Sequence, residues 1–187
     1  MSKNEDKNRV FPVEEAKHLD RSIRKWLQKP NKILKNWVKE GMTVLDFGSG
    51  TGYFTTEIAK LVTETGKVLA VDLQQGMLDI IRHKIEGTDL EKRISLIKCE
   101  TRSINVQEKV DMVFAFYVVH EVPNKNKFLM EVKSILKPSG ILMIVEPMGR
   151  VSKRDIEDMI KWAEEIGFHL LSRPKIFFSR SVVLEKK

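Results

Sequence analysis

Residues in the first half of the chain have the types and spacing to hold a ligand that carries both a positive and a negative group. Residues 44–55 read VLDFGSGTGYFT, in which Asp46 ends an apolar run. Three glycines follow at alternate positions, Gly48, Gly50 and Gly52. Glycines let the backbone approach a ligand closely, and the amides that begin the next helix favour a carboxylate or a phosphate. Because Asp46 would repel pyrophosphate but pair with an ammonium group, the pattern predicts an amino-acid head.

A second acid and the spacing of the glycines narrow the range of possible ligands further. Dinucleotide-binding turns have the spacing G-x-G-x-x-G and phosphate loops G-x-x-x-x-G-K-[ST], whereas this chain has G-x-G-x-G. Asp72 is the second-last residue of the run KVLAVDL, twenty residues after Gly52. An acid at that place accepts hydrogen bonds from ribose hydroxyls in dinucleotide folds. The pocket is therefore expected to take an amino acid at one end and a ribose at the other, and S-adenosylmethionine is a common metabolite with both.

Alternating strands and helices have to position these residues. The predicted strands are 43–47, 67–73, 94–99, 110–117, 140–147, 168–172 and 179–186. The predicted helices are 13–27, 31–40, 53–65, 75–86, 124–136 and 153–166. Asn31 and Asn124 are expected as N-caps, and Ser152 with Asp155 as a capping box.

The order of these elements predicts an α/β fold. Strands 168–172 and 179–186 have no helix between them, so they are expected to pair antiparallel, because a parallel crossover needs about a dozen residues or more. The prediction is a doubly wound, seven-stranded, mostly parallel sheet with an antiparallel C-terminal hairpin at one edge and helices on both faces.

Composition places the chain among globular proteins. Apolar residues make up 42% of the 187 and charged residues 32%, which is typical of a folded domain. The start, MSKNEDKNRV, has no apolar signal core, and the run MVFAFYVV is too short to span a membrane. A cytoplasmic location is therefore expected. The single cysteine, Cys99, excludes an internal disulfide framework and a multi-cysteine zinc site; no metal is expected.

Most of the net charge of +7 comes from the N-terminal 40 residues. Residues 1–40 hold eleven lysines and arginines against six acidic residues. Such a segment could attract nucleic acid or an anionic substrate, or it could be a solvated helix surface. His18, Arg21 and Trp26 in this segment could help to define the substrate, although surface or packing roles explain them equally well.

Five motifs, taken together, give the chain a resemblance to a known family. They are VLDFGSGTG, VLAVDLQQGML, KCET, VDMVFAFYVVHEVPN and LKPSGILMIVEP, in this order. From about residue 41 to 187 the chain resembles the class I S-adenosylmethionine-dependent methyltransferases, most closely their small-molecule and quinone-type branch. The resemblance implies the Rossmann-like methyltransferase fold, S-adenosylmethionine as cofactor and methyl transfer by in-line displacement.

The resemblance also implies roles for individual residues. Asp46 and the glycines would hold the methionine part, Asp72 the ribose, and Leu73 the adenine face. Glu100 and the Thr101 amide would contact the adenine edge, and Tyr117 would line the methionine region. The implied cofactor-binding residues are Asp46, Gly48, Ser49, Gly50, Gly52, Asp72, Leu73, Glu100, Thr101 and Tyr117.

A base for the methyl acceptor would lie near the ends of the fourth and fifth strands. His120 and Glu121 follow Tyr117 closely, and Glu146 ends the fifth strand. Histidine is the usual base near neutral pH, so His120, with Tyr117 beside it, is the catalytic candidate. The alternatives are a structural hydrogen bond for His120, a capping role for Glu146 and a solvent-facing or capping role for Glu121.

Two segments are expected, a helical substrate lid at 1–40 and a methyltransferase domain at 41–187. The predicted function is methyl transfer to a small molecule; the alternatives are RNA or protein methylation through the basic segment, and cofactor binding without catalysis. The Asn/Asp-Pro-Pro-aromatic tetrad of base-nitrogen methyltransferases is replaced by FYVVHEVP here. A small-molecule acceptor is the expected partner, a homodimer remains open, and nucleic acid is less favoured.

Overall fold

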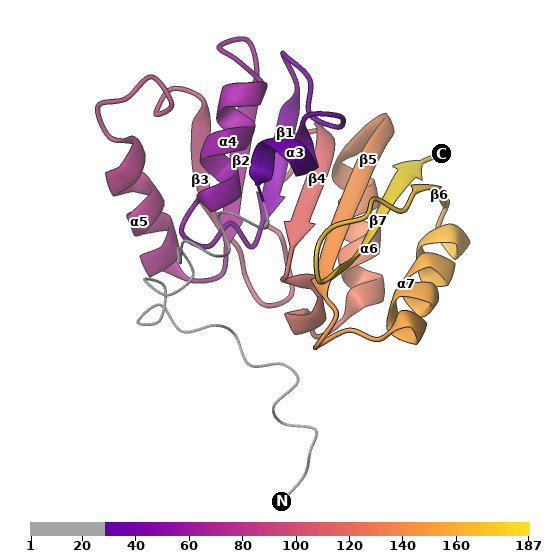
Figure 1. The fold of residues 1–187 in the computed structure, drawn as a ribbon. Helices are drawn as coiled ribbons and strands as arrows, with labels where there is room; N and C mark the ends of the chain where they lie inside the picture. The colour runs from indigo at the N-terminus through magenta and orange to yellow at the C-terminus, as the bar shows by residue number, and fades with distance from the viewer. Residues whose placement is uncertain (1–28) are drawn as a thin grey trace, which may run out of the picture.

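One seven-stranded sheet runs through the structure, a computed structural model that describes residues 29–187. Its strand order is β3-β2-β1-β4-β5-β7-β6, and Figure 1 shows the C-terminal strands at one side of the sheet. The strands are β1 (Thr43–Phe47), β2 (Lys67–Asp72), β3 (Ile94–Lys98), β4 (Val110–Phe116), β5 (Leu136–Pro147), β6 (Phe168–Ser172) and β7 (Ser179–Lys186).

The pairing confirms the predicted mixed sheet. β1 lies between β2 and β4 and is parallel to both, and β3 and β5 continue the parallel part. β7 is antiparallel to both β5 and β6. The terminal hairpin is thus turned so that its second strand enters the sheet and β6 forms the edge. The chain order reverses between β1 and β4, and ligands of doubly wound sheets bind at such a switch point.

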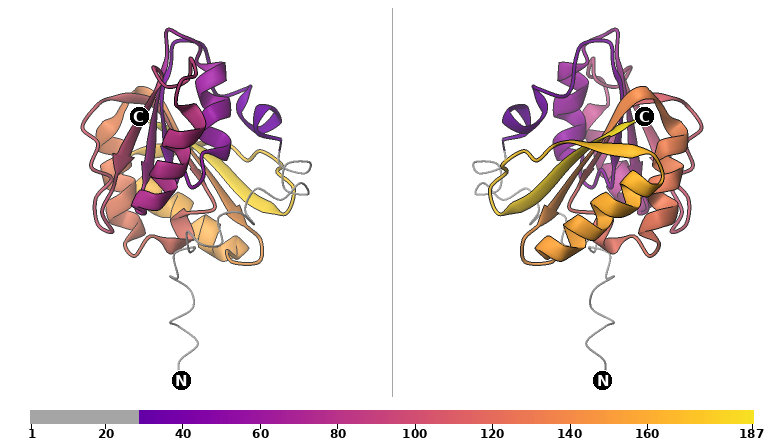
Figure 2. Two further views of the ribbon diagram at one scale, coloured as in Figure 1. Left: turned by 90° about the vertical axis from the view of Figure 1, so that its left-hand side faces the viewer. Right: turned by 90° about the vertical axis from the view of Figure 1, so that its right-hand side faces the viewer.

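Helices cover both faces of the sheet, as Figure 2 shows from two sides. Alternate residues of β4 divide the core between the faces: Phe114 packs with α4 and α5, and Val113 packs with α6 and α7. The helices are α3 (Pro30–Leu34), α4 (Tyr53–Leu61), α5 (Gln75–Ile85), α6 (Lys125–Ile135) and α7 (Lys153–Glu165), with a short 3-10 turn, η3 (Val119–Glu121), after β4. The central strands β1, β2 and β4 are buried on both faces because both are covered, as expected of a parallel sheet.

Two predicted helix starts are confirmed. The Asn124 side chain caps α6 by accepting from the Lys127 amide at 2.9 Å. Ser152 and Asp155 form a reciprocal capping box at the start of α7. These caps are local interactions, so the sequence alone could identify them.

The helix predicted over 31–40 is present but shorter, and the prediction of Asn31 as its cap was wrong. α3 begins with Pro30, preceded by Lys29 as its N-cap, and it ends at Leu34. Proline is well suited to the first helical position because its missing N–H is not needed there. The helix buries Leu34, and the turns after it bring Val38 into the same core, which surrounds α4.

Two further boundaries differ from the prediction. α4 ends at Leu61 rather than at 65, and Thr63 takes a left-handed conformation with φ of 62° just beyond it. Helices commonly end through one left-handed residue, and glycine is the usual one; the chain uses a threonine, so the sequence signal at Gly66 was misleading. β5 begins at Leu136 and includes Pro138 before a register shift, whereas a strand from residue 140 was expected.

Part of the sequence prediction falls on residues 1–28. The helix predicted over 13–27, and with it His18, Arg21 and Trp26, lies outside the described residues. The division at residue 40 therefore stays a prediction. Among the described helices, none combines the length and the apolar character that crossing a membrane would require.

Candidate functional site

The three glycines after β1 perform different tasks. All have positive φ, 70° at Gly48, 52° at Gly50 and 81° at Gly52. A Cβ on Gly48 would lie 2.5 Å from Val118 Cγ2, and one on Gly52 would lie 2.8 Å from Ile81 Cγ1. A Cβ on Gly50 would meet nothing within 4 Å. Gly48 and Gly52 therefore permit close packing, whereas Gly50 leaves open space beside the turn.

Asp72, at the end of β2, holds this turn in place. Its Oδ2 accepts from the Gly50 amide at 2.8 Å and its Oδ1 from the Gln74 amide at 2.9 Å. Burial raises the pKa of Asp72, and these backbone hydrogen bonds oppose that effect. The carboxylate thus links the glycine turn to the segment after β2.

Asp46 is the more deeply buried of the two acids. It is 3% exposed, and its Oδ2 accepts from Thr55 Oγ1 at 2.6 Å. The pKa of Asp46 is raised to about 7, and burial is the largest cause. The hydrogen bond from Thr55 opposes this rise, and the charge of Asp72 adds to it. A positive charge placed near these two carboxylates would relieve both the burial and the repulsion.

A cleft of about 850 Å³ opens beside the turn, within the size range of ligand pockets. Ten of the predicted site residues line it: Asp46, Gly48, Ser49, Gly50, Asp72, Leu73, Glu100, Thr101, Tyr117 and His120. Gly52 does not line it and packs against Ile81 instead. The structure thus brings together residues from the ends of four strands.

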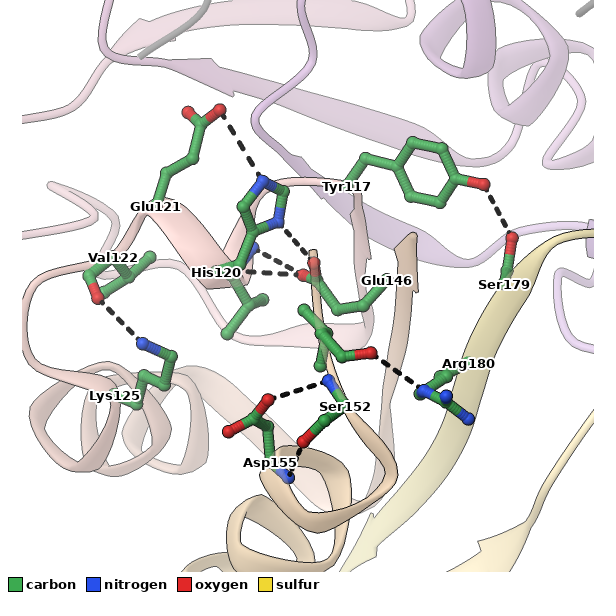
Figure 3. Close-up of polar contacts among 12 residues, drawn as sticks. Tyr117, His120, Glu121, Val122, Lys125, Glu146, Ser152, Asp155, Ser179 and Arg180 are labelled. Carbon is green, nitrogen blue, oxygen red and sulfur yellow. Dashed lines mark hydrogen bonds and ion pairs between the residues drawn. The ribbon is translucent and has the colours of Figure 1, made fainter. Parts of the chain in front are cut away.

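Tyr117 follows β4 and is held on two sides. Its φ is 59°, its ring stacks on Phe116 with centroids 4.2 Å apart, and its hydroxyl is 2.7 Å from Ser179 Oγ on β7. Ser179 Oγ in turn donates to the Phe177 carbonyl at 3.0 Å. The phenol is therefore used in a hydrogen-bonded connection between β4 and β7 (Figure 3).

His120 and Glu146 form the closest side-chain pair at this end of the cleft. His120 Nδ1 lies 2.5 Å from Glu146 Oε2, and Glu146 is fully buried at the end of β5. Figure 3 shows Glu121 on the other side of the imidazole, with its Oε1 3.9 Å from His120 Nε2. Glu121 lines the cleft with a side chain only 20% exposed, so the expectation that it faces solvent or caps α6 was wrong.

Several lining residues were missed by sequence reasoning. The loop after β3 contributes Arg102, Ser103 and Ile104, and the segment after β5 contributes Arg150. From α6, Glu131 accepts from Ser103 Oγ and from the Ile104 amide, each at 2.9 Å. The rule that ligands lie beyond the carboxyl ends of parallel strands could have identified the two loops. Glu131 gives no such signal, because it sits in the middle of a helix.

Cys99 packs in the core on one face of the sheet. It is 6% exposed, and burial, followed by the charge of Asp72, raises the pKa of its thiol to about 11. A thiol with this pKa is protonated at neutral pH and is a weak nucleophile. Among the described residues, no group of three or more histidine, cysteine or acidic side chains could hold a metal ion.

Comparison with known proteins now identifies the family. The profile of the methyltransferase domain family matches residues 38–173. A solved S-adenosylmethionine-dependent methyltransferase from Aquifex aeolicus is 30% identical, with a TM-score of 0.85 over 95% of this chain and 100% of that one. The chain belongs to the S-adenosylmethionine-dependent methyltransferases, as its motifs indicated.

More specific relatives are found within this class. The ubiquinone/menaquinone biosynthesis C-methyltransferase UbiE of Escherichia coli is 31% identical over 137 residues, which are 73% of this chain and 53% of UbiE. The chain thus spans about half the length of the curated relatives it matches. A methyltransferase from Pyrococcus furiosus, 17% identical over 92% of this chain and 97% of that one with a TM-score of 0.69, shares the fold.

Proposed function

We propose that this protein transfers a methyl group from S-adenosylmethionine to a small-molecule acceptor. The observation that carries the proposal is the pair of buried acids, Asp46 and Asp72, at a glycine turn in one cleft that also reaches His120. A dinucleotide or a triphosphate would bring further negative charge to these acids. A sulfonium amino acid brings positive charge instead.

The residues of the turn suit this cofactor. Ser49 Oγ is buried and has no hydrogen-bond partner among the described residues, and Gly50 faces open space. A ligand carboxylate beside the turn would supply an acceptor for Ser49, and the ammonium group would approach Asp46. Asp72 retains unused lone pairs for ribose hydroxyls, and Leu73, Glu100 and Thr101, which line the same cleft, would hold the adenine.

Bound S-adenosylmethionine supplies a methyl group on a sulfonium, whose leaving group is already a good one. The protein therefore has to align the acceptor, exclude water and handle a proton where the acceptor has one. Aromatic side chains line the cleft beside the polar groups: Phe47, Phe54, Phe116, Tyr117 and Phe128. Such walls favour a flat, apolar acceptor, and an acceptor of the quinone type, as the name of UbiE indicates for that protein, is part of this proposal.

Binding and transfer are tested separately. Calorimetry with S-adenosylmethionine and with NAD should give binding of the first only. Incubation with the methyl-labelled cofactor and a panel of thiols, phenols, hydroquinones and mixed tRNA should label a small molecule. Binding of NAD in preference to S-adenosylmethionine would refute the proposal.

The same panel decides the alternative of RNA methylation. Label found only in tRNA, with binding that weakens steeply as salt rises, would favour RNA, because phosphate contacts release counterions. The basic surplus that suggests this alternative lies within residues 1–40, of which only 29–40 are described. A cytoplasmic location and a homodimer stay proposals from the sequence, to be checked by fractionation and by light scattering.

A further inference from the structure

Glu146 is a buried acid that does not reach the cleft. It has no exposed surface, and it is absent from the residues lining the cavity. Its Oε1 accepts from the Val119 amide at 2.8 Å and from the His120 amide at 3.3 Å, and its Oε2 contacts His120 Nδ1 at 2.5 Å. Burying a carboxylate is costly unless it is well hydrogen-bonded, so an apolar residue at this position would be the simpler choice for stability alone.

These contacts favour one position, Nδ1, for the proton of the imidazole. Two backbone amides can only donate, and donation to a carboxyl group favours its ionised form. An ionised Glu146 has no proton to give, so His120 Nδ1 must carry the hydrogen of the pair. The neutral ring then has its lone pair on Nε2.

The Nε2 side of the ring belongs to the cleft. His120 lines the cavity and its side chain is 15% exposed. The distance of 3.9 Å from Nε2 to Glu121 Oε1 is too long for a hydrogen bond. Within residues 29–187, no hydrogen bond to Nε2 is recorded, and the ring is turned as Figure 3 shows, with Glu146 on one side and Glu121 on the other.

We propose that Glu146 positions His120 as the base that removes a proton from the methyl acceptor, so that the acceptor atom carries an ionisable hydrogen, as in a phenol, a hydroquinone or a thiol. This inference rests on the proposed methyl transfer. The proton moves from the acceptor to Nε2, and the acceptor atom forms a bond to the methyl carbon. The bond from that carbon to sulfur breaks, its electron pair stays on sulfur, and the imidazolium later releases the proton to solvent.

The charges around the ring favour this direction of transfer. Glu146 reaches His120 from β5 and Glu121 from the same turn, so an imidazolium would lie between two acids. Burial raises the pKa of Glu121, while the charges of His120 and of Arg150, which follows β5, lower it. Asp72 adds a further negative charge nearby. A proton that reaches Nε2 would therefore lie among acidic groups from several elements.

The first experiment reads the tautomer directly and needs no acceptor. Nitrogen NMR of the imidazole rings at pH 8 should show His120 with its hydrogen on Nδ1; His120→Gln assigns the signal among the four histidines. Glu146→Gln can keep the two amide bonds through its carbonyl oxygen while its NH₂ group faces Nδ1. The hydrogen should then move to Nε2. Hydrogen already on Nε2 in the wild type would overturn the proposal.

The second experiment measures turnover with the best acceptor of the panel. At a pH below the acceptor pKa, Glu146→Gln and His120→Gln should each lower kcat by about 10²–10⁴-fold, with the cofactor Kd within about threefold of the wild type. The loss should shrink across a series of increasingly acidic acceptors, because an ionised acceptor needs no base. His83→Gln, at an exposed helix histidine bonded to the Asp79 carbonyl, is the matched control and should be silent.

The outcomes separate the two proposals. Cofactor binding and transfer that survive unchanged in Glu146→Gln and His120→Gln would overturn the role of the pair and leave the methyltransferase proposal intact. Failure of the wild type to bind S-adenosylmethionine would refute the proposed function, and the inference with it. A loss of kcat in Glu146→Gln that is the same for acidic and weakly acidic acceptors would overturn the positioning role. Glu146 would then only support the η3 turn, whose amides it binds.

Discussion

The two ends of the cleft are built in different ways. At the cofactor end, Gly48 and Gly50 lie in one short stretch of chain, and the acid that holds the Gly50 amide ends the next strand. At the acceptor end, His120 meets an acid 26 residues later and Tyr117 meets a serine 62 residues later. The first end is specified by backbone conformation, the second by contacts between strands that are distant in sequence.

This difference predicts different responses to mutation. A site made of backbone should fail when a side chain is added, since the turn has no room to adjust. A site made of side-chain contacts should lose chemistry or stability in steps while cofactor binding persists. Each of the following variants tests one end against the other.

The largest effect is expected for Gly48→Ala. The added Cβ would lie 2.5 Å from Val118 Cγ2 at a residue with φ of 70°. Crowding and left-handed strain together should cost about 2–5 kcal/mol of unfolding free energy. Denaturant unfolding measures the loss of stability, and calorimetry measures the effect on cofactor binding.

Gly50→Ala is the matched control for that variant. Its Cβ meets nothing within 4 Å, although φ is 52°. Stability should fall by about 1–2 kcal/mol from strain alone, while the cofactor, whose space the methyl group enters, should bind much more weakly. Equal destabilisation by both alanines would contradict the division of tasks among the glycines.

Asp46→Asn should stabilise the protein in a pH-dependent way. The folded pKa of about 7 lies above the ordinary aspartate value of 3.8, so the wild type loses stability as pH rises from about 4 towards 7. Asparagine retains an acceptor for Thr55 but cannot ionise. The variant should therefore match the wild type near pH 4 and exceed it above pH 7 by up to about 4 kcal/mol, at ~1.4 kcal/mol per pKa unit.

The same variant should bind the cofactor more weakly, because the ammonium group loses its charged partner. Wild-type affinity should rise with pH up to about 7 and then level, and Asp46→Asn should lack this dependence. Thermal unfolding and calorimetry across pH 5–8 measure the two trends. A variant that is no more stable at pH 8 than the wild type would show that Asp46 is not buried as described.

Asp72→Ala should weaken cofactor binding by about 1–3 kcal/mol, the value of lost hydrogen bonds to a charged group. The structure adds that this acid also holds the amides of Gly50 and Gln74, so some stability should be lost as well. Asp79→Ala, an exposed acid on α5, is the control and should leave binding unchanged. Unaltered affinity in Asp72→Ala would mean that the ribose is held elsewhere.

The contrast between the ends also explains how much the sequence could predict. The parallel part of the sheet was expected from helices that alternate with strands, and the glycine turn, Asn124 and the Ser152 capping box are local signals. They were predicted because each depends on residues within a few positions. The early end of α4 was missed, since Thr63 adopts a conformation that the sequence assigns to glycine.

The acceptor end could only be predicted in outline. His120 and Glu121 were considered because they follow β4, and Glu146 because it lies at the end of β5. No local sequence signal indicates that His120 contacts Glu146 or that Glu121 lines the cleft. Those contacts require the register of β4 on β5, which pairs Phe116 with Val145. Register between distant strands is set by packing of the whole sheet, and a single sequence does not state it.

Tyr117→Phe gives the smallest and most discriminating effect. Removing the hydroxyl breaks the 2.7 Å contact with Ser179 Oγ between β4 and β7, which should cost about 0.5–1.5 kcal/mol of unfolding free energy. The ring and its stacking on Phe116 remain, so the cofactor Kd should stay within about twofold, and only the acceptor KM should change. Steady-state kinetics beside calorimetry separate these quantities.

The size of the kcat change in Tyr117→Phe then decides what the phenol does. If kcat stays within a few-fold, the hydroxyl serves the connection to β7 and the proton chemistry belongs to His120. A fall of about 10²-fold or more, the range of a group that moves a proton in the transition state, would mean that the phenol acts on the acceptor, as its place after the fourth strand suggested. The two ends would then differ further, because the acceptor end would hold two groups able to take one proton.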